Sequence, residues 1–133
     1  MDADLIRWKK DKLLQLLILL AGIHSCILGL AMLFATRLMV ETLGFAASVP
    51  VFFPSQSGIF MLILGLFYLR ALADPAFVWT ILVSKMLAVT FLLVHVLFLA
   101  APPIIWAAGA GDAAMLVAVA FMVRRNRRPA FGE

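Results

Sequence analysis

The sequence predicts an all-α fold, a four-helix transmembrane bundle, on the strength of three observations. Of the 133 residues, 65% are hydrophobic and 14% are charged, whereas an average soluble domain has about 45–50% apolar and about 25% charged residues. Four apolar runs are each close to the roughly 20 residues that a helix needs to cross a bilayer. None of these runs alternates between apolar and polar residues, and four strands are too few to close a barrel in lipid. So short a chain cannot bury this much apolar surface in water, which excludes a soluble enzyme, a disordered tail and a disulfide-stapled secreted module.

The chain is predicted to form a single integral membrane domain over residues 1–133. Its four membrane-spanning helices are expected at about 13–35, 56–73, 77–101 and 104–123, from the length that a bilayer requires. The only cysteine, Cys26, lies inside the first of them, so an intrachain disulfide is excluded.

The connections between these helices differ in length. Asp74-Pro75 marks a tight turn, in which the proline suits the first helical position and the aspartate suits the cap. Two consecutive prolines mark a second tight turn, before the last helix. The first connection, at about 20 residues, is too long for a turn alone, and apolar residues surround its Arg37 and Glu41. We therefore expect a short interfacial helix on the outer surface within this connection.

Basic residues beside the spans predict the orientation of the chain. Four Lys or Arg residues precede the first span at 7–12, and four follow the last span at 124–128. Arg70 lies in a turn on that same side, and Arg37 alone lies on the other. Cytoplasmic loops carry the excess of Lys and Arg, so both termini are expected to be cytoplasmic. These flanking residues also account for the net charge of +4, and no basic face interleaved with aromatic residues indicates nucleic-acid binding.

Two ionisable residues inside the spans are predicted to pair. With about 30 Å of hydrocarbon and about 1.5 Å per residue, Lys85 lies about 12 Å and Asp112 about 16 Å from the cytoplasmic edge. Their helices are joined by a short turn and should be antiparallel neighbours. A charged side chain at this depth needs a partner, so we predict a buried Lys85–Asp112 ion pair, with His24 at a similar depth as a third member. The pair either fixes the register of the two helices or forms a proton or ligand site.

The other polar candidates are expected nearer the membrane surfaces. His95 lies toward the outer end of its helix, and Gln56 begins the second span, where it can bond the backbone or a ligand headgroup. His24 and His95 differ by about 10 Å in depth, which argues against a shared haem, and His24 with Asp112 provides too few ligands for a metal site. No nucleophile–base set, phosphate-binding loop or dinucleotide-binding motif is present. We therefore predict no catalytic residue, no metal and no resident cofactor.

Small residues recur at helical spacing and are expected to form helix-packing faces. In lipid, glycines let helix backbones approach closely, which drives helix association. The predicted packing positions are Gly22, Gly29, Gly58, Gly65 and Gly109. Such faces either pack within the bundle or receive a helix from a partner.

A set of short motifs in the second, third and fourth spans carries a family resemblance. The motifs are Gly58-x6-Gly65-x2-Tyr68, Asp74-Pro75, Trp79, Lys85 and Asp112. This pattern resembles small uncharacterised four-helix inner-membrane proteins of bacteria, the DoxX-like group, over about residues 13–123. The resemblance implies a four-helix fold in the bacterial inner membrane, and it implies no established activity or substrate.

The sequence favours a non-catalytic function. The absence of a catalytic set and the extent of the small-residue faces indicate an accessory or assembly subunit of a larger membrane complex, acting through helix packing. The alternative is a binder or carrier of a small amphiphile (a lipid or a quinone) or of a proton, which uses the cluster of His24, Lys85 and Asp112. The partners expected are membrane lipid and other membrane-protein subunits or further copies of this chain.

Overall fold

The computed structural model describes residues 8–46 and 50–127, and within these ranges it is helical, with no strand. The α-helices and the single 3₁₀ turn are α2 (Lys12–Phe34), α3 (Thr36–Thr42), α4 (Phe52–Arg70), η1 (Pro75–Phe77), α5 (Val78–Phe98) and α6 (Ile104–Arg127). Four helices, α2, α4, α5 and α6, are long and apolar enough to cross a membrane. The prediction of four apolar helices is therefore confirmed, with the second helix beginning a turn earlier than expected, at Phe52.

Local signals explain where these helices begin. Asp11 precedes α2, and its Oδ1 accepts a hydrogen bond of 3.1 Å from the backbone N–H of Leu14. Asp74 precedes η1 and accepts a hydrogen bond from the N–H of Ala76, with Pro75 in the first helical position. Both arrangements satisfy N–H groups that a helix start leaves without a partner. The first connection does contain a short helix, α3.

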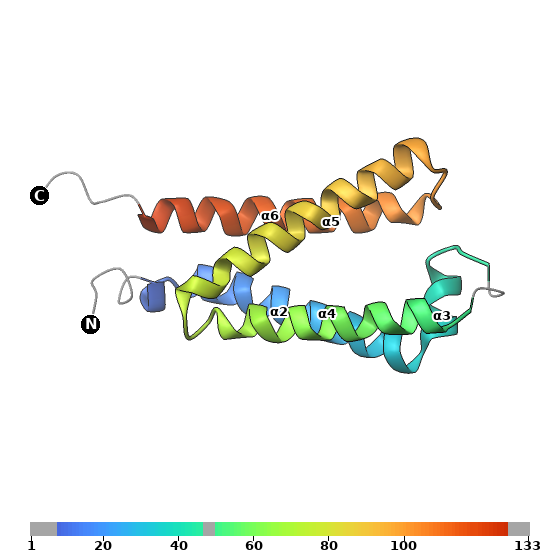
Figure 1. Ribbon diagram of the computed structural model, residues 1–133. Helices are drawn as coiled ribbons and strands as arrows, with labels where there is room; N and C mark the ends of the chain where they lie inside the picture. The colour runs from blue at the N-terminus through green and yellow to red at the C-terminus, as the bar shows by residue number, and fades with distance from the viewer. Residues whose placement is uncertain (1–7, 47–49, 128–133) are drawn as a thin grey trace, which may run out of the picture.

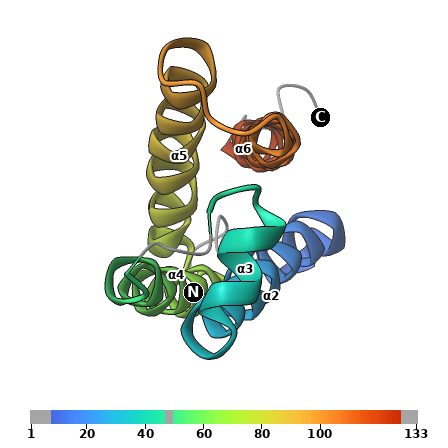
Figure 2. The ribbon, with the colours of Figure 1, turned by 90° about the vertical axis from the view of Figure 1, so that its right-hand side faces the viewer.

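The four long helices run up and down in two pairs (Figure 1). Helices α2 and α4 form one closely packed pair, and α5 and α6 form the other. The start of α2 and the end of α6 lie at one end of the molecule, whereas α3 and the turn between α5 and α6 lie at the opposite end. Helix α5 leans away from α4 as it leaves the turn that joins them (Figure 2).

Glycines bring α2 and α4 into backbone contact at two levels. A Cβ added to Gly29 would lie 2.6 Å from the backbone N of Leu62 and 2.7 Å from the carbonyl O of Gly58. A Cβ added to Gly65 would lie 2.8 Å from the backbone N of Cys26. Real Cβ atoms do not approach backbone atoms this closely, so any larger residue would force the two helices apart.

The structure places four of the five predicted packing glycines at this interface: Gly22, Gly29, Gly58 and Gly65. The expectation of a close-packing role for Gly109 is not met. A Cβ added there would lie 3.6 Å from the Cβ of Leu92, an ordinary contact distance. No backbone atom of α5 lies within 4 Å of that position, so a glycine is not needed there.

The end of the bundle near the chain termini is closed by packing and by polar contacts. The indole N–H of Trp8 donates to the carbonyl of Ala71, which ties the residues before α2 to the turn after α4. The side chains of Arg125 and Asn126 each donate to Asp11 Oδ2 at 2.8 Å, which ties the end of α6 to the start of α2. The buried apolar cluster adjoins these contacts, with Leu14, Ile18, Ile81 and Val119 fully buried.

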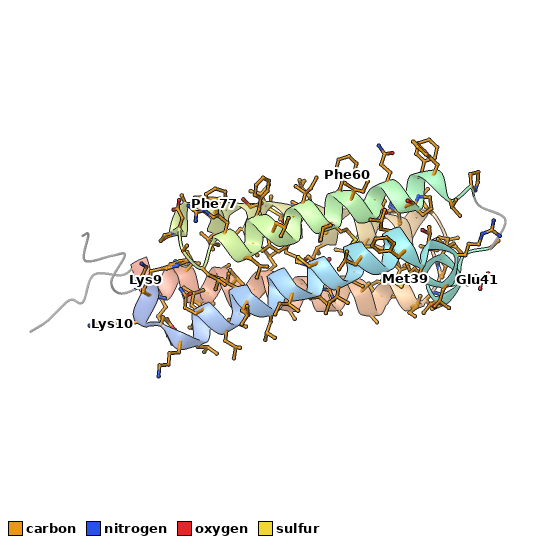
Figure 3. The ribbon with its side chains drawn as sticks, turned by 90° about the horizontal axis from the view of Figure 1, so that it is seen from below. Lys9, Lys10, Met39, Glu41, Phe60 and Phe77 are labelled. Atoms are coloured by element: carbon orange, nitrogen blue, oxygen red, sulfur yellow. The ribbon has the colours of Figure 1, made fainter. Side chains whose placement is uncertain are left out.

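The outward faces of the long helices are apolar. Phe60 points away from the bundle on α4 (Figure 3) and is 58% exposed. Large hydrophobic side chains on the other long helices are similarly exposed, among them Ile27, Leu87 and Phe121. Surfaces of this kind are stable in lipid and not in water, in agreement with the hydropathy of the four helices.

Candidate functional site

A cavity of about 520 Å³ lies between the two helix pairs. Residues of α2, α3, α4, α5 and α6 form its wall. The divergence of α5 from α4 provides the space, since these helices meet near their connecting turn and separate beyond it. A cavity of this size falls within the range of small-molecule sites, about 300–1,000 Å³.

The charged part of the cavity wall is an ion pair between α5 and α6. Lys85 Nζ lies 2.5 Å from Asp112 Oδ1, and the two side chains are 7% and 20% exposed. The structure thus brings these residues together, as the depth argument from the sequence predicts. An isolated charge would be costly in the membrane interior, so each partner needs the other. Among the residues that the structure describes, Oδ2 of Asp112 has no hydrogen-bond partner.

A second polar contact joins α4 to α5 beside this pair. The hydroxyl groups of Tyr68 and Ser84 are hydrogen-bonded to each other. Ser84 also donates to the backbone carbonyl of Thr80. A serine hydroxyl has a single hydrogen, so Tyr68 is the donor in its bond with Ser84. The Tyr68 oxygen then keeps only its capacity to accept a further hydrogen bond.

The rest of the wall is apolar and rich in methionine. Three of the chain's seven methionines line it, namely Met32, Met39 and Met61. Methionine is flexible and polarizable and is common on surfaces that adapt to different ligands. Met39 comes from α3, so this short helix forms part of the wall at the end of the bundle away from the chain termini.

The cavity opens sideways through residues of α5. Leu87 and Phe91 line it and are also 60% and 59% exposed. A side chain that lines a cavity and also faces outward lies at the mouth of that cavity. Because the outward faces of α4 and α5 are apolar, this mouth is directed toward the surface that lipid would cover.

His24 does not join the ion pair, contrary to the expectation from its depth. Its side chain is exposed on α2, and the adjacent Ser25 lines the cavity in its place. Successive residues of an α-helix differ by about 100° around the axis. His24 therefore has a suitable depth and faces the wrong direction.

The secondary polar candidates do not form part of the cavity wall. A ring nitrogen of His95, Nδ1, lies 2.8 Å from the backbone carbonyl of Phe91, and the imidazole ring lies over the ring of Phe91. Gln56 is exposed on the first turns of α4. Neither lines the cavity, so a contact of Gln56 with a ligand headgroup would have to occur on the outside of the bundle.

Three polar members of the wall were not among the predicted site residues: Tyr68, Ser84 and Ser25. Tyr68 is the only tyrosine of the chain and lies on the face that carries Gly58 and Gly65. Ser84 directly precedes the predicted charged residue Lys85. The available signal for Ser84 was its position next to a charged residue inside an apolar span. This signal is weak, because neighbouring residues of a helix point in different directions.

The aspartate outside the spans is held in its charged form. Burial by itself would raise the pKa of Asp11, but hydrogen bonds from Asn126, from the Leu14 N–H and from Arg125, together with the charge of Arg125, outweigh burial and lower that pKa. Asp11 thus remains an acceptor for both helix ends over the ordinary range of pH.

Taken together, the site consists of an internally neutralised ion pair, a tyrosine oxygen that can accept, and a long apolar wall. In the part of the chain covered by the described residues, no three His, Cys, Asp or Glu side chains gather in a way that could hold a metal ion. No family model, curated protein or solved structure matches this chain.

Proposed function

We propose that this protein is a non-catalytic membrane protein that binds a small amphiphile, a lipid or a quinone, in the cavity between its helix pairs. The observation that carries the proposal is the cavity of about 520 Å³ with a charged pair in an otherwise mainly apolar wall. An amphiphile matches both parts, with its chain against the methionine-rich wall and its head beside Lys85 and Asp112. The side opening at Leu87 and Phe91 supports entry from the bilayer.

Binding without catalysis agrees with the chemistry of the wall. The single acidic side chain that lines the cavity, Asp112, is engaged by Lys85. Covalent catalysis needs a nucleophile hydrogen-bonded to a base, and among the described residues neither cavity serine is hydrogen-bonded to Asp112 or Lys85. The residues that line the cavity offer Tyr68 and two serines beside this pair, a set suited to hydrogen bonding with a ligand.

We further propose that the chain lies in the bacterial inner membrane with both termini in the cytoplasm and α3 at the outer surface. Lys9 and Lys10 lie at the opposite end of the bundle from Glu41 (Figure 3). The basic residues at 124–128 belong to the same end as these lysines by sequence, which supports this orientation. Single cysteines at residue 3 and within 125–128 should resist impermeant thiol reagents in intact cells, whereas one at residue 48 should react. Labelling of either terminus from outside would contradict the orientation.

Two neighbouring alanines on α6 allow a matched test of ligand binding. Both alanines are exposed, but Ala108 lines the cavity and Ala107 does not. Native mass spectrometry of the protein purified in mild detergent should show a retained amphiphile in the wild type and in Ala107→Trp. The Ala108→Trp variant should lose that molecule, because the indole fills the space that it occupies. Equal retention in both variants would contradict binding in the cavity.

A second candidate function, an accessory subunit of a larger complex, is favoured by one face of α6. A Cβ added at Gly111 would meet no atom within 4 Å, and Ala107 and Ala114 are also exposed. Small residues facing lipid allow another helix to approach closely. If the protein acts in this way, it should co-purify in mild detergent with a larger partner at fixed stoichiometry, and Gly111→Leu should abolish that association. A lone protein that retains an amphiphile would favour the first candidate.

A further inference from the structure

The most accessible charged group of the cavity is a hydrogen-bond acceptor, the carboxylate of Asp112. Asp112 uses Oδ1 to bind Lys85, and its Oδ2 has no partner among the described residues. Tyr68 donates its one hydrogen to Ser84, because the hydrogen of Ser84 is committed to the carbonyl of Thr80. The phenol oxygen of Tyr68 can therefore only accept a further hydrogen bond, and the residue is 2% exposed, so it offers a ligand little access.

The donors of the cavity are less accessible. The ammonium group of Lys85 has further N–H groups, but the lysine side chain is 7% exposed and the Asp112 side chain is 20% exposed. A ligand in the cavity thus meets the carboxylate more readily than the ammonium. Ser25, on the α2 wall, can donate or accept and does not alter this balance.

We infer that the ligand's head donates hydrogen bonds and carries no negative charge, as in a long-chain alcohol or a long-chain amine. This inference rests on the proposed function and specifies its ligand class. A hydroxyl or ammonium head donates to Asp112 Oδ2. A phosphate or carboxylate head would face the carboxylate at short range, where the low local dielectric strengthens repulsion. A quinone in its oxidised form has carbonyl acceptors and no donor, so it would leave Asp112 Oδ2 unsatisfied.

Four probes with the same 18-carbon chain length separate these possibilities: oleylamine, oleyl alcohol, methyl oleate and oleyl phosphate. Their heads are a cationic donor, a neutral donor, a neutral acceptor and an anion. Binding to the purified wild-type protein is measured by native mass spectrometry at equal mole fraction in the detergent. The amine and the alcohol should each bind about tenfold better than the ester, since a hydrogen bond to a charged group is worth about that factor. The phosphate should bind least.

The outcomes distinguish the inference from the function on which it rests. If methyl oleate or oleyl phosphate binds as well as the alcohol, the inference is overturned and amphiphile binding stands. If none of the probes binds the wild type better than it binds Ala108→Trp, the proposed function fails with it. The wild-type comparison alone decides the inference, so it does not depend on the folding of any variant at the ion pair.

A double variant, Lys85→Gln with Asp112→Asn, gives an independent check. It removes both charges and supplies amide donors as well as acceptors. The preference for alcohol over ester should fall to about equal binding, because the charged acceptor is gone. If the folded double variant still prefers the alcohol to the ester, Asp112 is not the cause of that preference and the inference is overturned.

Discussion

Helix α4 packs against two other long helices, α2 and α5, and it meets them in opposite ways. Its contact with α2 is closed along its length, with Gly58 and Gly65 set against the α2 backbone. It approaches α5 at the connecting turn, where Phe67 packs on Phe77 of η1, and it contacts α5 through the hydrogen bond between Tyr68 and Ser84. Beyond that bond the two helices separate around the cavity. The contrast shows that backbone contact through glycines closes an interface, whereas a short turn only makes two helices start together.

The largest effect should come from the Lys85–Asp112 ion pair in the cavity wall. Asp112→Leu leaves Lys85 as an unpaired charge inside the membrane and should destabilise the fold by about 3–5 kcal/mol. The double variant Lys85→Met with Asp112→Leu should recover most of that loss, because it leaves no charge to bury. Folded yield in membranes and resistance to denaturant in detergent are the measurements. A double variant no better than the worse single variant would show that the two charges do not depend on each other.

A single added methyl group at the interface between α2 and α4 should destabilise the fold. Gly29→Ala places a Cβ 2.6 Å from the backbone N of Leu62 and should cost about 2–3 kcal/mol, the upper range for overpacking. Gly109→Ala is the matched control, since its Cβ meets Leu92 at 3.6 Å. The control should be neutral or slightly stabilising, because alanine favours helix more than glycine does. Thermal unfolding in detergent compares them, and equal Tm values would remove the distinction between the two interfaces.

A smaller effect is expected from the hydrogen bond that joins α4 to α5. Tyr68→Phe removes the hydrogen bond to Ser84 and should cost about 1 kcal/mol. A double-mutant cycle with Ser84→Ala isolates the bond from other effects of each substitution. A coupling energy near zero in unfolding measurements would mean that this bond does not hold α4 to α5.

The smallest effect should be a pH dependence at the closed end of the bundle. The pKa of Asp11 is lowered in the folded protein, so its contacts stabilise the fold above the unfolded pKa of about 4. This contribution is lost as the pH falls through the lowered folded pKa. Near neutral pH the wild type should have a higher Tm than Asp11→Ala. This difference in Tm should shrink below a pH of about 4. A pH-independent difference would mean that the charge of Asp11 plays no part.

The sequence predicts where the helices lie along the chain better than it predicts which side of each helix faces the bundle interior. Hydropathy and length give four apolar helices because the bilayer requires about 20 residues for each. Depth arithmetic also brings Lys85 to Asp112, since a long lysine side chain tolerates an error of a few ångströms. The same arithmetic fails for His24, because depth does not specify direction around the helix axis. In an apolar span both the inward and the outward faces are hydrophobic, so the pattern carries little information about facing.

The cavity itself has no comparable signal in the sequence. Gly22, Gly29, Gly58 and Gly65 indicate close packing, but Gly109 looks the same in the sequence and packs loosely. The difference depends on which side chains the opposite helix presents, and that is a property of the assembled bundle. The tilt of α5 likewise follows from packing between helices, which single-helix patterns do not encode.

The central claim is that α4 and α5 enclose a ligand while α2 and α4 exclude one. Photocrosslinking with a diazirine-bearing oleyl alcohol in membranes, followed by mass-spectrometric mapping, tests it most directly. Labels are expected on cavity residues such as Met61 and Leu64, and they should be lost in Ala108→Trp and retained in Ala107→Trp. Labels confined to outward-facing residues such as Phe60 and Phe121, and unchanged in both variants, would contradict it.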